Sequence, residues 1–228
     1  MTTMSDRPRV VDLTHVVEDG MVTYPGLPAP EVGVHLTREA SRAVYAEGTT
    51  FEIGRIAMVT NTGTYYDAPL HRFADGADLT GVPLERVAAV PGLVVDVRGR
   101  AGAGVTAADL AGVDVAGRAV LLRTGHDARW RTPAYAVDGP FLAADGARLL
   151  AQEGAVLVGI DAMNIDDTTD GTRPAHTTLL AAGVGVLEHL TNLGALPADG
   201  FELHAAPVPV RGLGTFPVRA YAVVRDGG

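Results

Sequence analysis

Short apolar runs, separated by glycine, proline and polar residues, recur along the chain. Compact runs at Leu93 to Val97, Ala119 to Arg123 and Ala155 to Ile160 predict buried strands. Glu31 to Leu36 alternates apolar and polar residues, which is typical of a strand with one solvent-facing side. Further strands are expected at Val10 to Val16, Phe51 to Thr60, Val184 to Leu187, Phe201 to Ala206 and Arg219 to Val224.

Helical spacing of apolar residues occurs between several of these runs. Phe141 to Glu153 has this spacing and is followed by Gly154, a residue suited to end a helix. Thr177 to Ala182, closed by Gly183, predicts a short helix, and Thr106 is expected to cap another. Strands that alternate with helices indicate an α/β fold with a mixed sheet core and flanking helices.

Length, charge and composition narrow the class of protein. The chain has 228 residues without a repeat or a convincing linker, so we expect residues 1–228 to form one domain. A net charge of -9 without a basic run argues against a nucleic-acid partner or a membrane surface. Cysteine is absent, which excludes thiolate chemistry and suits a reducing compartment. Because the N-terminus also lacks an apolar signal segment, we expect a soluble cytoplasmic protein that acts on a small molecule.

The segment "NTGTYYDAPLHRF" carries the clearest candidate chemistry. Its Gly63 and Pro69 exclude one long helix and predict a strand end, a turn and a short helical segment. Asp67 and His71 flank the proline, so a carboxylate and an imidazole converge from a rigid turn. That pair suits metal binding or acid–base work, whereas a capping aspartate and a surface histidine are the plainer interpretation.

Five segments, in this order along the chain, change the balance between those interpretations. They are "DLTHVVEDGMVTYPG", "NTGTYYDAPLHRFADG", "LLRTGHD", "GIDAMNIDD" and "HTTLLAAGVGVLEHLTNL". Together they resemble the cyclase family that includes bacterial kynurenine formamidase and isatin hydrolase. The resemblance covers almost the whole chain and implies a swivelling β/β/α fold.

The family's signature, H-x-G-T-H-x-D-x-P-x-H, is only partly kept. Asn61 and Tyr65 stand where the family has two metal-binding histidines. Asp67 matches a metal-bridging carboxylate, and His71 matches the general acid/base. Since an amide and a phenol are weaker ligands than neutral imidazole, Asn61 and Tyr65 are expected to contact substrate instead. Tyr65 is also expected to take part in catalysis, as a donor to a developing oxyanion.

The family's remaining metal ligands come late in the chain. His176 in "RPAHTTLL" and Glu188 in "VLEHLTNL" match them, so the resemblance implies one half-site of Asp67, His176 and Glu188. Such nitrogen and oxygen ligands suit zinc or manganese. We therefore expect a single divalent metal ion or none.

Other residues have two interpretations each. His15 is expected to line the site or to be structural, and Trp130 lies in a loop that covers the site or forms an oligomer contact. Tyr24 falls where the family has a pocket aromatic, although a plain turn aromatic is the alternative. His35, His189 and His204 are interpreted as structural or surface residues. The acidic cluster of Asp161, Asp166 and Asp167 either binds a cation or caps a loop and orients its neighbours.

The sequence thus predicts a hydrolase or cyclase that acts on a C–N or C–O bond of a small amide, lactam, lactone or ester. One alternative is a metal-independent cyclase, dehydratase or isomerase that uses Tyr65, Asp67 and His71. A second alternative is a binding protein that keeps the family pocket without catalysis. The resemblance also implies a homodimer or homotetramer, with Gly20 to Pro30 suited to contacts between subunits.

Overall fold

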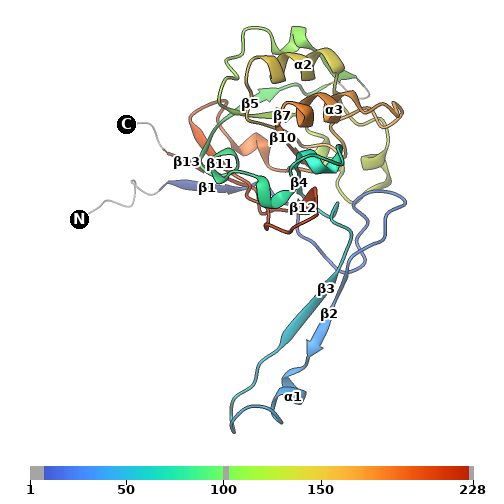
Figure 1. The fold of residues 1–228 in the computed structure, drawn as a ribbon, viewed down its shortest axis with the longest axis vertical. Coiled ribbons are helices and arrows are strands. Elements are labelled where there is room, and N and C mark those ends of the chain that lie inside the picture. The colour runs from blue at the N-terminus through green and yellow to red at the C-terminus, as the bar shows by residue number, and fades with distance from the viewer. Residues whose placement is uncertain (1–7, 100–102, 226–228) are drawn as a thin grey trace, which may run out of the picture.

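A mixed β-sheet runs through the body of the molecule (Figure 1). The structure is a computed structural model that describes residues 8–99 and 103–225. Within these residues the sheet has nine strands in the order β1-β13-β11-β5-β7-β9-β10-β4-β12. Their bounds are Arg9–Asp12 (β1), Tyr221–Val224 (β13), Phe201–His204 (β11), Val90–Asp96 (β5), Ala119–Arg123 (β7), Leu157–Ile160 (β9), Gly185–Glu188 (β10), Tyr65–Asp67 (β4) and Thr215–Pro217 (β12).

The four middle strands are parallel, and the strands on both sides of them are antiparallel. Successive residues of β7 therefore face two separate cores: Leu121 packs in one, and Val120 and Leu122 pack in the other. Helices α2 (Ala144–Gln152) and α3 (Pro174–Ala181) cover the second core. Burial on both faces explains why these strands consist of continuous apolar runs. The predicted mixed α/β class is confirmed.

Several predicted helix and strand boundaries are wrong, and the pairing of strands or the position of a proline explains two of them. Phe141 and Leu142 form strand β8 (Phe141–Leu142), which pairs with β6 (Gly104–Val105), so the predicted helix begins only at Ala144. The helix expected from Thr177 begins at Pro174, because proline is well placed in a first helical turn. The stretch after Thr106 is a 3-10 turn, Ala107–Leu110. Strand β12 is present although no pattern predicted it.

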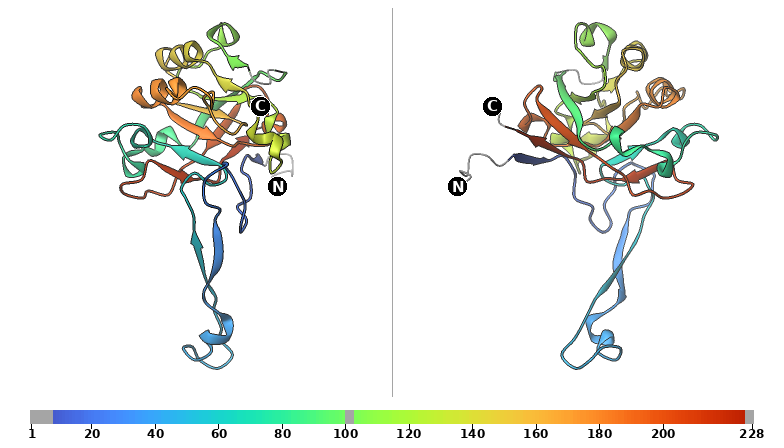
Figure 2. Two further views of the ribbon diagram at one scale, coloured as in Figure 1. Left: turned by 90° about the vertical axis from the view of Figure 1, so that its right-hand side faces the viewer. Right: turned by 60° about the vertical axis from the view of Figure 1, so that its left-hand side comes forward.

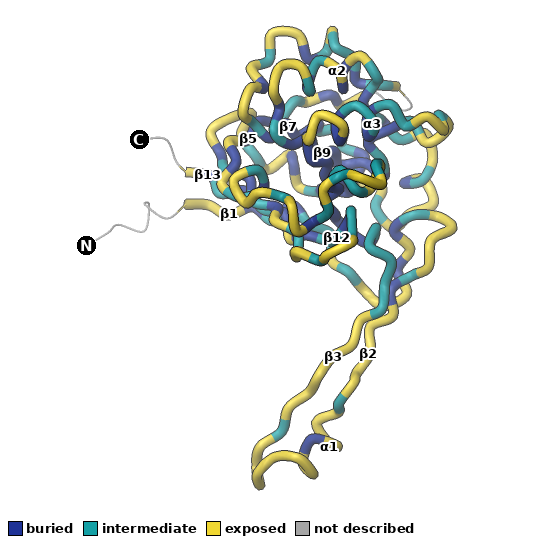
Figure 3. The backbone as a smooth tube through the Cα atoms, viewed as in Figure 1, coloured by how far each residue is buried: buried dark blue, intermediate teal, exposed yellow. Residues whose placement is uncertain are grey.

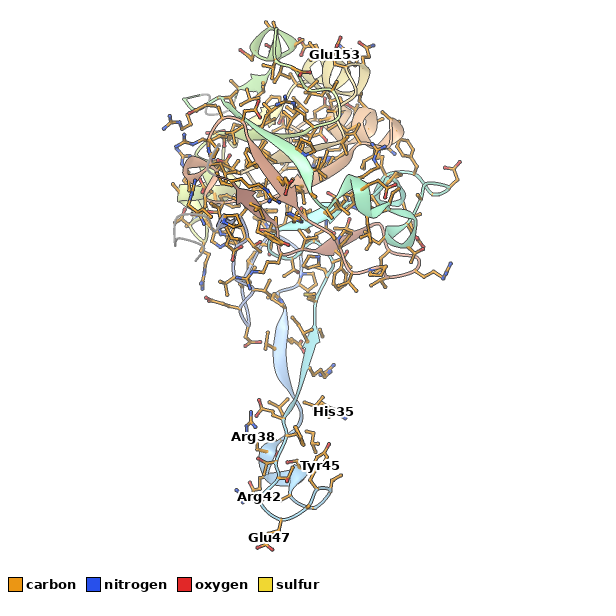
Figure 4. All side chains as sticks on the ribbon, turned by 90° about the vertical axis from the view of Figure 1, so that its left-hand side faces the viewer. His35, Arg38, Arg42, Tyr45, Glu47 and Glu153 are labelled. Atoms are coloured by element: carbon orange, nitrogen blue, oxygen red, sulfur yellow. The ribbon has the colours of Figure 1, made fainter. Side chains whose placement is uncertain are left out.

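An arm of residues 31–57 projects from the body (Figure 2). It consists of β2 (Glu31–Leu36), α1 (Arg38–Ser41) and β3 (Ile53–Ala57), and β2 and β3 form a two-stranded sheet of their own. Almost the whole arm is exposed (Figure 3), and its tip carries Arg38, Arg42 and Tyr45 (Figure 4). Gly20 to Pro30, the segment that we expect to contact another subunit, is a looped stretch at the base of the arm.

The helices of the described ranges, 8–99 and 103–225, include none with both the length and the apolar character that a membrane span requires.

Candidate active site

Strand β4 lies between β10 and β12, and this pairing assembles the centre of the site. Tyr65 is opposite Glu188 on β10, and Asp67 is opposite Thr215 on β12. Because strand registers fix which side chains are neighbours, residues more than 100 positions apart become adjacent. All four of these side chains are buried.

Asp67 and His176 face each other with one unsatisfied atom each. His176 Nε2 lies 3.7 Å from Asp67 Oδ2 and 3.5 Å from Glu188 Oε1. Within the described residues, both His176 Nε2 and Asp67 Oδ2 lack a hydrogen-bond partner although they are buried. Buried polar atoms are nearly always paired, so two unpaired atoms that face one another indicate a missing ligand.

Asp166 fixes the orientation of His176. Its carboxylate accepts hydrogen bonds from the N–H groups of Ala175 (2.6 Å) and His176 (3.1 Å) at the start of α3. The Nδ1 atom of His176 lies 2.6 Å from Asp166 Oδ2, which turns Nε2 toward Asp67. A carboxylate behind a histidine is a common support for a metal ligand. Of the two interpretations of the acidic cluster, capping and orienting its neighbours describes Asp166.

The hydroxyl of Tyr65 is tied to Glu188. Its hydroxyl donates to Glu188 Oε2 over 2.6 Å, while Glu188 Oε1 accepts from the N–H of Ile165 over 2.6 Å. Burial raises the pKa of Tyr65 well above its ordinary value, and the charges of Glu188 and Asp67 add to that effect, so the hydroxyl keeps its proton. Tyr65 is therefore a donor that holds Glu188 in place.

His71 sits at the outer edge of this group, in the 3-10 turn Pro69–His71. The Thr215 hydroxyl hydrogen bonds Asp67 Oδ1 and lies 2.8 Å from His71 Nδ1. Since a carboxylate accepts the hydroxyl proton, Thr215 Oγ1 accepts from Nδ1–H, and Nε2 of neutral His71 is left as a base. With 34% of its side chain exposed, His71 can meet both solvent and substrate.

The charges around His176 suit a cation. Burial works to lower the pKa of His176, but Glu188, Asp166 and Asp67 outweigh it and raise that pKa. Burial raises the pKa of Glu188. Ligands about 2.1 Å from a tetrahedral ion lie about 3.4 Å apart, close to the observed separations. The site therefore fits a divalent metal ion.

The third ligand has two candidates. Donor atoms of Asp67, His71 and His176 all lie within 4.8 Å of one another, whereas the sequence assigned the third position to Glu188. Glu188 Oε1 is near His176 but already accepts a backbone hydrogen bond, and a carbonyl-type oxygen can accept two. By geometry alone, either His71 or Glu188 can be the third ligand.

An aromatic cluster lies beside Tyr65. His15 stacks on Trp130, with ring centroids 4.0 Å apart and an interplanar angle of 8°. Tyr135 and His189 complete the cluster, and the rings of Tyr65 and His189 are 5.2 Å apart. Burial lowers the pKa of His15 to about 4 and that of His189 to about 3, so both rings are neutral at pH 7.

The remaining predicted residues are less closely involved. Asn61 is half-buried and comes before β4. A hydrogen bond from its side chain works to lower the pKa of Tyr65, but burial outweighs that effect. Tyr24 lies in a turn closed by the Leu27 N–H, with no hydrogen bond or ring contact to these residues in the described ranges. Sequence reasoning missed Thr215 and Tyr135, since neither belongs to a recognisable motif.

Known proteins resemble this chain along nearly its whole length. A sequence model of the Cyclase family matches residues 11–167. Kynurenine formamidase from Erythrobacter litoralis is 32% identical over 214 residues, which cover 92% of this chain and 91% of that enzyme. A solved structure described as a potential metal-dependent hydrolase with cyclase activity has a TM-score of 0.76 and 29% identity, covering 96% of this chain and 100% of that one. Isatin hydrolase A from Labrenzia aggregata has a TM-score of 0.78 and 25% identity, with coverages of 96% and 94%.

The fold, the buried acid–base and carboxylate groups, and these relatives define an enzyme of the hydrolase and cyclase class. Its mixed sheet is the scaffold that the similar structures share. The chain belongs to the Cyclase family.

Proposed function

We propose that this enzyme hydrolyses a small amide or lactam, or catalyses the reverse ring closure, with one divalent metal ion at Asp67, His176 and Glu188. The observation that carries the proposal is the pair of unsatisfied buried atoms, Asp67 Oδ2 and His176 Nε2, beside the half-exposed base His71. Relatives named kynurenine formamidase and isatin hydrolase support an amide or lactam as the substrate. Zinc and manganese both suit the donor set.

The chain's own residues account for the proton transfers. A divalent ion in such a site supplies Lewis acidity toward a carbonyl oxygen or water. His71 Nε2 takes a proton from the attacking water and returns it to the leaving nitrogen, so one C–O bond forms as the C–N bond breaks. Thr215 holds the His71 ring through Nδ1, and it links that ring to Asp67. Tyr65 keeps Glu188 in one orientation throughout.

Tyr65→Phe is expected to lower kcat on the preferred substrate about ten- to hundredfold, because it frees one oxygen of a buried ligand. The Michaelis constant should change less, since the hydroxyl is turned toward Glu188 rather than the substrate. Hydrolysis of formylkynurenine and isatin, followed by absorbance in wild type and variant, provides the measurement.

Tyr221→Phe is a matched control, because Tyr221 is a half-buried tyrosine stacked on His204 and lies outside the site. It should leave kcat unchanged. Failure of the wild-type protein to hydrolyse either an amide such as formylkynurenine or a lactam such as isatin, with metal supplied, would refute the proposed reaction. An unchanged kcat in Tyr65→Phe would refute only the role given to Tyr65.

A second copy of this chain is the partner we propose for the arm. Val32 pairs with Ile56 across the two strands, and these side chains are 52% and 50% exposed. Phe51 at the tip is also 52% exposed. An isolated two-stranded ribbon is marginal in water, and exposed apolar residues along its length favour burial against another surface.

The double variant Val32→Asp/Ile56→Asp is expected to convert a dimer or tetramer into monomers, because it places charge on both strands of the arm. Light scattering coupled to size-exclusion chromatography measures the mass. Leu84→Asp serves as the control, since Leu84 is 67% exposed on the body, and its mass should equal that of wild type. A monomeric wild type, or a double variant with unchanged mass, would contradict the proposed partner.

A further inference from the structure

His189 is a fully buried histidine with a constrained backbone. It is 0% exposed, and its φ of 55° lies in the left-handed region, which is uncommon for residues other than glycine. The backbone is held there at both ends: its N–H donates to Ala162 O over 3.1 Å, and its carbonyl accepts from Thr64 Oγ1 over 2.6 Å. Such conformations persist at sites where surrounding contacts determine them, and they concentrate at functional positions.

Tyr135 defines which ring nitrogen of His189 carries the proton. The Tyr135 hydroxyl lies 2.9 Å from His189 Nδ1, its hydrogen-bond partner among the described residues. If the hydroxyl donates, the histidine proton is on Nε2. The opposite arrangement would leave the buried hydroxyl proton without an acceptor, which is the more costly state. His189 Nε2 is therefore an N–H donor.

This N–H donor has no hydrogen-bond partner among the described residues. His189 Nε2 is buried and unsatisfied within the described residues, and so is Nε2 of His15 nearby. Both imidazoles lie against Trp130, whose ring is 5.6 Å from that of His189. Trp130 and His15 are half-exposed, whereas Tyr65, Tyr135 and His189 are buried. A ligand would therefore reach His189 by displacing or sliding along Trp130.

We propose that His189 binds the substrate, donating its Nε2–H to a carbonyl oxygen in a subsite walled by Trp130, His15 and Tyr65. A carbonyl oxygen completes the missing hydrogen bond, and the flat face of an amide or lactam can pack against an aromatic ring once Trp130 is displaced. The inference rests on the proposed function for the nature of the ligand. His189 belongs to neither the family signature nor the metal half-site.

Oxindole, a stable lactam, tests the subsite without any hydrolysis. Calorimetric titration of the purified enzyme measures its affinity, and fluorescence quenching of Trp130, the single tryptophan, locates it. His189→Phe keeps a flat ring but removes the donor, so binding should weaken about tenfold. Tyr135→Phe keeps the imidazole but frees its tautomer, so a smaller loss of about threefold is expected. His35→Ala removes an exposed histidine from the arm and should leave the affinity unchanged.

Thermal melting of each variant shows whether it folds. If His189→Phe fails to fold, Tyr135→Phe still tests the subsite. Weaker binding in both folded variants supports the subsite. Equal binding in wild type and the variants, or no oxindole binding to wild type, overturns it. Turnover of formylkynurenine or isatin is scored separately. Activity without a His189 effect on binding refutes the subsite alone, whereas His189-dependent binding without activity refutes the proposed reaction alone.

Discussion

His71→Ala is expected to lower kcat/KM by about a hundredfold to ten-thousandfold, the usual loss when a general acid–base group is removed. His71 is the one member of the buried group with a substantially exposed side chain, and Thr215 directs its ring through Nδ1. Metal content should stay at the wild-type value if Glu188 is the third ligand. Steady-state kinetics and elemental analysis of the same preparation provide both measurements.

His176→Ala is the matched comparison, because His176 lies near the other carboxylate oxygen of Asp67 and is 5% exposed. This variant should lose metal and activity together, since its Nε2 is one of the two unsatisfied atoms. Loss of metal from His71→Ala would show that His71, Asp67 and His176 form the ligand set instead. Full activity of either variant would exclude its residue from the chemistry.

Leu122→Ala is expected to reduce the free energy of unfolding by about 2–5 kcal/mol. Leu122 is 0% exposed in central strand β7, in the core that α2 and α3 cover. Removing its side chain leaves a cavity that strands on either side cannot close without breaking their ladders. Chemical denaturation followed by circular dichroism measures the change.

Leu84→Ala is the control for this loss, because Leu84 is 67% exposed in the 3-10 turn Leu84–Arg86. Its free energy of unfolding should lie within about 0.5 kcal/mol of the wild-type value. A loss below about 1 kcal/mol in Leu122→Ala would mean that the core tolerates the missing volume, contrary to the close packing that is usual in protein interiors.

Local sequence patterns predicted the strands that are buried on both faces. They failed where a segment becomes a strand only because it pairs with a distant strand. Ala119 to Arg123 is the observed β7, since a continuous apolar run flanked by glycine and polar residues specifies a central strand. Phe141 and Leu142 join a strand because Gly104 and Val105 pair with them, a contact that periodicity does not contain. β12 is too short to form a pattern and exists through its pairing with β4.

The candidate site could be predicted where the residues carry recognisable chemistry. Asp67, His71, His176 and Glu188 do lie together, as the resemblance to the family implied, although their individual roles stay predictions. Thr215 could not be found, because a threonine becomes informative only when the strand register places it against Asp67. His189 was interpreted as structural or surface, since sequence shows neither its burial nor its unpaired nitrogen.

The pairing of β4 with β12 also sets when the site can form during synthesis. Asp67 and Thr215 are 148 residues apart, and Tyr65 and Glu188 are 123 apart. Contacts over such separations form late in folding, after the entropy of closing a long loop has been overcome. A nascent chain that ends before β12 lacks the strand that shields Asp67. The candidate site is therefore completed only when β12 (Thr215–Pro217) has left the ribosome, and chains that stall before β12 would accumulate without it.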